Sequence, residues 1–143
     1  MNDMLSLLRE ACRREREQTL FYRALVGEAE LAGDVQVSER LNELLADEQH
    51  HVARLTARIL ELGEAPDGAQ PSPPAAKLMT WIADAEAREA AEVAWYEDAI
   101  GSLVDGATAG LFQEILRSER NHLNALGGKW MSAEAPTRER TQS

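Results

Sequence analysis

The stretch "DEQHHVARL" at residues 47–55 decides the fold, because it sets a carboxylate and an imidazole within an apolar helical stripe. Apolar residues recur around it at steps of three and four, which predicts one helix over residues 35–62. Leucines precede and follow on this stripe, yet Glu48 and His51 occupy the two positions between them. A core-facing stripe that contains two polar groups must supply each of them with a partner inside the protein.

Three further segments show the same helical periodicity, at residues 3–32, 74–104 and 108–130. None of them shows the period-two alternation of strands, and residues that favour helices dominate all four segments. Each of these stripes is apolar near its ends and polar at its centre. The central polar residues are Glu15 in the first segment, Glu89 and Glu92 in the third, and Glu119 and His122 in the fourth. The sequence therefore predicts an all-α protein, an antiparallel four-helix bundle built from two helical hairpins.

Glycine, proline and capping residues predict where these helices begin and end. Gly33 is expected to end the first helix, and Asp34 to cap the second. Ser72 followed by Pro73 predicts the N-cap and first helical position of the third helix. Thr108 is a candidate cap for the fourth helix.

Length and composition predict one domain and exclude several classes of partner. The 143 residues carry 25 acidic and 15 basic side chains, a formal charge of -10, which excludes nucleic acid and anionic membranes as main partners. Cys12, the single cysteine, excludes an internal disulfide and a thiolate metal cluster. No apolar run could cross a membrane and no signal segment begins the chain, so we expect a cytoplasmic protein. We expect the bundle over residues 1–131 and a polar, flexible tail over residues 132–143.

The central acids of the four stripes are expected to lie at one level of the bundle. Glu15 and Glu48 are equally far from the first turn, and Glu89 and Glu119 are equally far from the last turn. Residues equidistant from a turn lie side by side in an antiparallel hairpin, so each hairpin brings two glutamates together. If the hairpins pack centre to centre, acids from all four helices meet in one layer.

An internal repeat relates the two hairpins. The stretch at 47–55 matches "SERNHLNAL" at 118–126 in its Glu, its His and its final Leu. Two similar hairpins about an approximate two-fold axis would build one symmetric site. Glu92 breaks the symmetry, because the repeat places Gln18 in the matching position.

Five carboxylates in one core layer cannot all stay ionised unless cations lie among them. Two divalent ions would nearly cancel their charge. Glutamate oxygens together with two imidazole nitrogens suit iron or manganese, and zinc fits the set as well. Residues three apart on a helix face the same way, so each Glu-x-x-His pair can give one metal a nitrogen and share a carboxylate. A structural alternative stays open, in which the polar layer only sets the register of the helices.

Each residue of the layer has an expected role in such a site. Glu48 and Glu119 are expected to bridge the two metals. His51 and His122 are each expected to bind one metal through an imidazole nitrogen. Glu15 and Glu89 are each expected to be a terminal carboxylate ligand of one metal. Glu92 is expected to be a spare ligand that binds in one oxidation state and leaves in another, or else to pair with an arginine. Tyr22 and Tyr96, each seven residues after a core glutamate, are expected to be donors to the ligands or radical traps, or else core packing. Glu92, Tyr22 and Tyr96 are the candidate catalytic residues.

With these residues the chain resembles the ferritin-like di-iron superfamily and, within it, the rubrerythrins. The resemblance rests on Glu15, the two Glu-x-x-His pairs and Glu89, and on Glu92, the extra carboxylate that sets rubrerythrins apart from ferritins and bacterioferritins. It implies a cofactor of two iron ions. It also implies a long crossover between the hairpins, here residues 63–74, which must span roughly 40 Å. It implies no haem, because Gln49 stands where bacterioferritin-like proteins use a methionine.

The resemblance further implies an oxidoreductase that reduces hydrogen peroxide or dioxygen at the di-iron site. Rubrerythrins usually carry a rubredoxin domain with two cysteine pairs, and this chain has none, so we expect an external electron donor protein. The alternative is a ferroxidase, for which Fe(II) is the substrate. A di-iron hydroxylase is less favoured, because the sequence shows no strong basic amphipathic face for a membrane. A homodimer is predicted from apolar residues beyond the stripes, namely Leu20, Phe21, Leu25 and Trp95.

Overall fold

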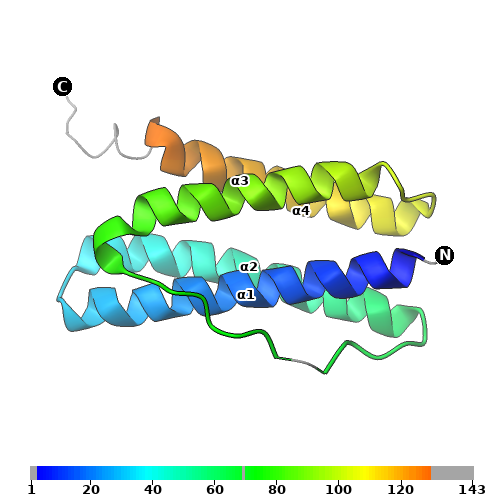
Figure 1. The fold of residues 1–143 in the computed structure, drawn as a ribbon, viewed down its shortest axis with the longest axis horizontal. Coiled ribbons are helices and arrows are strands. Elements are labelled where there is room, and N and C mark those ends of the chain that lie inside the picture. Colours follow the sequence, from blue (N-terminus) through cyan, green and yellow to red (C-terminus); the bar gives the residue numbers. More distant parts are fainter. Residues whose placement is uncertain (1–2, 69, 130–143) are drawn as a thin grey trace.

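The computed structural model describes residues 3–68 and 70–129, and it shows a bundle of four long helices (Figure 1). These are α1 (Asp3–Leu31), α2 (Val35–Glu61), α3 (Trp81–Ile100) and α4 (Gly106–Asn124). Helices α1 and α2 form one hairpin, α3 and α4 form the other, and a long extended segment joins them (Figure 1). The predicted all-α fold of two hairpins and a crossover is therefore confirmed. The tail predicted over residues 132–143 lies outside the described residues.

Gly33 ends α1 in the way that its position predicted. Its φ of 72° lies in the left-handed region that favours glycine. The Gly33 amide donates to the Glu30 carbonyl at 3.0 Å and the Asp34 amide to the Ala29 carbonyl at 2.9 Å, the paired bonds of a Schellman turn. Asp34 then caps α2, because its side chain accepts a hydrogen bond from the amide of Val37. Both predictions for this turn are confirmed.

The third helix begins later than predicted, so the assignment of Ser72 and Pro73 to its start was wrong. The chain stays non-helical through Lys77, a single 3-10 turn called η1 follows (Leu78–Thr80), and α3 begins at Trp81. The crossover has to span the bundle and needs these residues in an extended form. Trp81 is buried and anchors the start of the helix in the core.

The fourth helix is capped by Asp105, so the prediction that Thr108 is the cap was wrong. Oδ2 of Asp105 accepts from the Thr108 amide at 2.8 Å and from Nη2 of Arg58 at 2.9 Å. Thr108 is instead buried, and its hydroxyl accepts from Nε of Arg58 at 3.0 Å. A carboxylate is favoured at this position because it serves a backbone amide and a guanidinium together. A short π-helical turn, η2 (Ala125–Lys129), follows α4.

The crossover runs along the outer side of α1 (Figure 1). Arg9 donates from Nε and Nη2 to the Ala65 carbonyl, at 3.2 and 2.7 Å, and Arg16 donates from Nη2 to the Asp67 carbonyl at 3.1 Å. The segment returns the chain to the end of the bundle where α1 turns into α2. Helix α3 therefore starts there and runs back along the bundle.

The core consists of two apolar clusters with a polar layer between them. One cluster includes Leu8, Leu55, Tyr96, Phe112 and Ile115, and the other includes Phe21, Leu25, Leu41, Trp81 and Leu126. Phe21 and Leu25 are 1% and 0% exposed within this single chain, so they do not supply the surface from which a homodimer was predicted. Within the described ranges, no helix is long and apolar enough to cross a membrane.

Candidate metal centre

The polar layer contains every residue that the sequence predicted to be a metal ligand. All four long helices contribute to it, and each of its residues is at most 6% exposed. The residues are Glu15 from α1, Glu48 and His51 from α2, Glu89 and Glu92 from α3, and Glu119 and His122 from α4. The layer forms because each helix places these polar residues on the stripe that packs inward, between the two apolar clusters.

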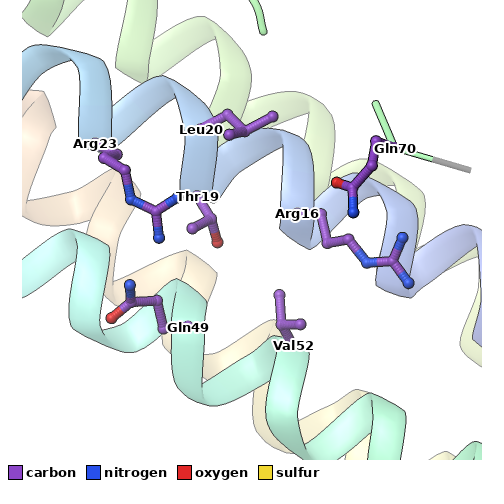
Figure 2. A pocket seen from close by; sticks show the side chains of 7 residues that line it. All are labelled: Arg16, Thr19, Leu20, Arg23, Gln49, Val52 and Gln70. Atoms are coloured by element: carbon purple, nitrogen blue, oxygen red, sulfur yellow. The ribbon is translucent and has the colours of Figure 1, made fainter. Parts of the chain in front are cut away.

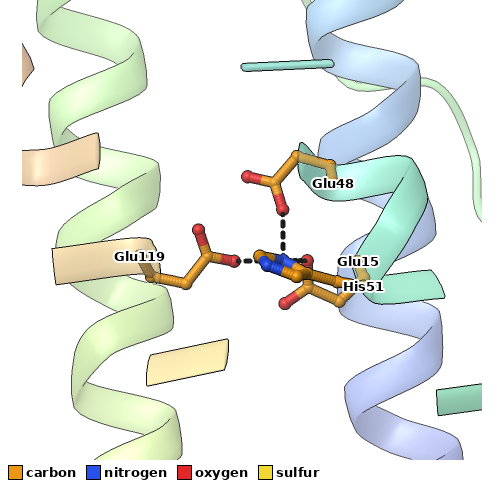
Figure 3. A group of neighbouring side chains, drawn as sticks. All are labelled: Glu15, Glu48, His51 and Glu119. Atoms are coloured by element: carbon orange, nitrogen blue, oxygen red, sulfur yellow. Dashed lines mark hydrogen bonds and ion pairs between the residues drawn. The ribbon is translucent and has the colours of Figure 1, made fainter. Parts of the chain in front are cut away.

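One half of the layer gathers Glu15, Glu48, His51 and Glu119, which each offer an atom within 4.8 Å of the others (Figure 3). Nδ1 of His51 lies 3.2 Å from Oε1 of Glu15, 3.3 Å from Oε1 of Glu48 and 3.5 Å from Oε2 of Glu119. The imidazole thus lies among carboxylates from three helices. A cation at this point would meet one nitrogen and three carboxylates.

The other half gathers Glu48, Glu89, Glu119 and His122 with the same spacing. Nδ1 of His122 lies 3.0 Å from Oε1 of Glu119 and 3.5 Å from both Oε2 of Glu48 and Oε2 of Glu89. Glu48 and Glu119 belong to both groups, which is the geometry that two bridging carboxylates require. Metal binding by these residues stays a prediction.

Three buried carboxylate oxygens in the described residues have no hydrogen-bond partner, namely Oε2 of Glu48, Oε1 of Glu89 and Oε2 of Glu119. A buried ionised oxygen without a partner is strongly unfavourable. Divalent cations would meet this need, since carboxylate and imidazole are the donors that iron and manganese bind. The residues present therefore fit a pair of such ions.

Burial and crowding change the protonation of the layer. Burial, together with repulsion from Glu15 and Glu89, raises the pKa of Glu119 to about 8, and burial and the same neighbours raise the pKa of Glu48 well above its usual range. Burial alone would lower the pKa of His51, but the nearby carboxylates of Glu119 and Glu15 outweigh this and raise the pKa to about 9. Protons therefore offset part of the negative charge, and a binding cation would displace them.

Two tyrosines each donate a hydrogen bond to a carboxylate of the other hairpin. These carboxylates, Glu15 and Glu89, are called the outer carboxylates because each belongs to only one of the two groups. The Tyr22 hydroxyl donates to Oε2 of Glu89 at 2.6 Å, and the Tyr96 hydroxyl donates to Oε2 of Glu15 at 2.7 Å. Burial and the nearby carboxylates raise both tyrosine pKa values well above the usual range, so both hydroxyls stay protonated donors. Of the expected roles, the structure shows the donor geometry, and a radical role stays a prediction.

Glu92 is the one acid of the layer that belongs to neither group. Its Oε1 accepts from Nε of Arg14 at 3.1 Å. Burial raises the pKa of Glu92 to about 7 although Arg14 opposes this. The structure thus shows the pairing with an arginine, while a role as a metal ligand stays a prediction.

Sequence reasoning missed Arg14 and its counterpart Arg88, although the repeat contained the signal. The spacing that relates Gln18 to Glu92 also relates these two arginines. Each arginine reaches across from its own helix: Arg14 to Glu92, and Arg88 through Nε to the side-chain oxygen of Gln18. Each guanidinium also lies over an aromatic ring, that of Trp95 and that of Phe21 respectively.

Asp47 was missed as well. Its Oδ2 lies 2.8 Å from Nε2 of His122, the ring nitrogen that faces away from the other carboxylates. Asp47 is on α2 and His122 is on α4, 75 residues later, so no local pattern connects them.

Comparisons with known proteins agree with this geometry. A family model described as Rubrerythrin matches residues 6–129. No curated protein matches the chain. Among solved structures, a dodecameric thioferritin, the bacterioferritin-related protein from Bacteroides fragilis, superimposes with a TM-score of 0.69 at 17% identity, over 98% of this chain and 93% of that one. At this identity the likeness shows a shared fold.

Proposed function

This chain belongs to the rubrerythrin family, and on that premise we propose that it is a di-iron oxidoreductase that reduces hydrogen peroxide or dioxygen. The observation that carries the proposal is the pair of buried ligand groups that share Glu48 and Glu119. Two bound iron ions would supply the two electrons that reduction of the peroxide O–O bond requires. The three unpartnered carboxylate oxygens support the proposal, because they are positioned to bind cations.

The chain's own residues hold the reacting centre and keep it dry. We assign Glu15 and His51 to one ion, Glu89 and His122 to the other, and Glu48 and Glu119 to both. The tyrosine hydroxyls orient the two outer carboxylates, since each donates to one of their oxygens. The apolar clusters on either side of the layer exclude water, which strengthens every charge interaction within it.

A groove between α1 and α3 offers a small oxidant a way to the layer. It has a volume of about 260 Å³, and its lining includes Glu92, Arg14 and Arg88. Glu92 lies between this groove and the ligands, and only Arg14 holds it there among the described residues. We assign to Glu92 a movement from Arg14 toward the ligand groups when the positive charge at the centre increases.

We propose that electrons for repeated turnover come from outside these 143 residues, because their single cysteine cannot bind an iron through the four thiolates of a rubredoxin-type site. We assign this task to an external electron donor protein.

Rapid mixing of the anaerobic, iron-loaded protein with peroxide tests the proposal. We expect fast oxidation in the parent protein and at least tenfold slower oxidation in Glu92→Ala, because that variant lacks the movable carboxylate. Glu97→Ala is the matched control, since Glu97 lies on the same helix, is exposed and pairs with Arg120. Equal rates in the parent and Glu92→Ala would remove the role assigned to Glu92, and no reaction with peroxide or dioxygen would remove the proposed activity.

A ferroxidase is the second candidate, and one feature favours it. A pocket of about 150 Å³ reaches from the surface to His122 and Asp47, and its lining also includes Glu43 with its ion-pair partner Arg40. Such a pocket would suit the entry of Fe(II) as a substrate. Counting iron after aerobic loading separates the candidates: two retained ions per chain favour a cofactor, and many ions per chain favour iron handling.

A further inference from the structure

Besides the exchange of Glu92 for Gln18, the two halves of the polar layer differ in what lies next to the outward-facing nitrogen of each histidine. A spacing of 71 residues relates Glu48 to Glu119 and His51 to His122. The same spacing relates Asp47 to Ser118. A carboxylate on one side of the layer therefore corresponds to a hydroxyl on the other.

In one half of the layer, the Asp47 carboxylate orients the imidazole of His122. Nδ1 of His122 faces the ligand carboxylates and Nε2 lies 2.8 Å from Oδ2 of Asp47. An Nε2–H that donates to Asp47 leaves the lone pair on Nδ1, directed at the metal position. A carboxylate behind a histidine also makes the imidazole a stronger ligand and limits its rotation.

On the His51 side, the described residues provide no such support. Nδ1 of His51 faces its carboxylates in the same way. Within residues 3–68 and 70–129, however, Nε2 of His51 has no hydrogen-bond partner, and Ser118 is only half-buried. This imidazole is therefore oriented from one side only.

We propose that the two metal positions are unequal, that the position at His122 binds a divalent cation first and more tightly, and that Asp47 is the positioning residue responsible. The inference rests on the proposed two-metal site. Removal of a carboxylate behind a metal-binding histidine weakens affinity by about 10–100-fold, which sets the size of the difference.

Two further observations bear on the order of binding. Glu92 could favour the opposite order by adding a carboxylate near Glu15, but it is paired with Arg14 and belongs to neither ligand group. The pocket that reaches His122 is lined by two carboxylates, Asp47 and Glu43, and by the guanidinium of Arg40, which pairs with Glu43 at 3.9 Å. The first observation removes the argument for the opposite order, and the second gives a cation a route to the His122 position.

Anaerobic calorimetric titration of the metal-free protein with cobalt(II) tests the inference. We expect two binding steps in the parent protein that differ by at least tenfold in affinity. In Asp47→Ser, which copies the other half of the layer, the tighter step should weaken by about 10–100-fold and the weaker step should not change. In Ser118→Asp, the weaker step should tighten, which loss of structure could not produce.

Double variants identify which of the two metal positions Asp47 affects. The effect of Asp47→Ser should disappear in a His122→Ala background and persist in a His51→Ala background, because Asp47 contacts only the first of these histidines in the described structure. Two equal steps in the parent, or an unchanged tight step in Asp47→Ser, would overturn the inference alone. Binding of fewer than two cobalt ions by the parent would instead overturn the proposed di-metal function.

Discussion

Each buried carboxylate in this bundle depends on what its two oxygens touch. The outer glutamates are each held by a tyrosine: Tyr96 donates to Oε2 of Glu15 at 2.7 Å and Tyr22 donates to Oε2 of Glu89 at 2.6 Å. Glu48, Glu119 and also Glu89 each leave one oxygen without a hydrogen-bond partner. At the scale of single residues, the layer therefore contains oxygens that the tyrosine hydroxyls hold and oxygens that a cation would complete.

Tyr96→Phe should destabilise the metal-free protein more than the metal-loaded protein. The variant leaves Oε2 of Glu15 buried without its donor, which costs about 1–3 kcal/mol of unfolding free energy. Bound cobalt(II) should reduce this loss, because a cation compensates the same carboxylate. Urea unfolding followed by circular dichroism measures both states. Tyr22→Phe is the matched variant, and an equal loss with and without cobalt(II) would contradict the prediction.

At the scale of elements, carboxylate caps determine where two of the helices begin. Asp34 caps α2 through the Val37 amide, and Asp105 caps α4 through the Thr108 amide. Asp105 also accepts from Arg58 of α2, so its cap joins one hairpin to the other. The start of α4 is therefore tied to the packing of the whole bundle, whereas the start of α2 is local.

Asp105→Ala should cost more stability than Asp34→Ala. Loss of an N-cap is destabilising, and Asp105→Ala also removes the partner of the Arg58 guanidinium, so we expect the larger loss there. Urea unfolding of both variants gives the two values. Both variants should still bind two cobalt ions, because neither cap touches the polar layer. A larger loss in Asp34→Ala would show that the contact with Arg58 adds nothing.

At the scale of the whole molecule, the polar layer makes stability depend on pH. The folded protein raises the pKa of Glu119 from its ordinary 4.5 to about 8 and the pKa of His51 from 6.5 to about 9. It therefore binds protons that the unfolded chain has released, so stability falls as pH rises from about 5 to 9. The lowered pKa of Glu15, about 2 instead of 4.5, has the opposite effect and makes stability rise with pH. This effect is confined to pH values below about 4.5.

The melting temperature of the metal-free protein should fall by roughly 5 °C or more between pH 6 and pH 9, since each kcal/mol shifts it by about 2–4 °C at this size. Bound cations should remove most of this slope, because they replace the protons and their affinity rises with pH. Differential scanning calorimetry with and without cobalt(II) measures both curves. Rising stability of the metal-free protein over this range would contradict the prediction.

Much of the centre could be predicted from the sequence because helical geometry is local. Steps of three and four residues place Glu15, Glu48, Glu89 and Glu119 on inward stripes, and equal distances from the turns place them at one level. The burial of all four confirms the inward stripes, and the spacing within 4.8 Å in each of the two groups confirms the level of the layer. Gly33 and Asp34 were predicted correctly for the same reason, since their hydrogen bonds reach only a few residues along the chain.

The sequence by itself therefore determined the helices, the stripes and the acids that share a layer. Only the tertiary structure decided the partners of these side chains: Arg14 meets Glu92 across 78 residues, and Asp47 meets His122 across 75. Such contacts depend on how far each helix rotates and how closely the hairpins approach, and packing of the apolar clusters sets both. The late start of α3 at Trp81 has the same origin, because the distance to be crossed exists only in the folded bundle.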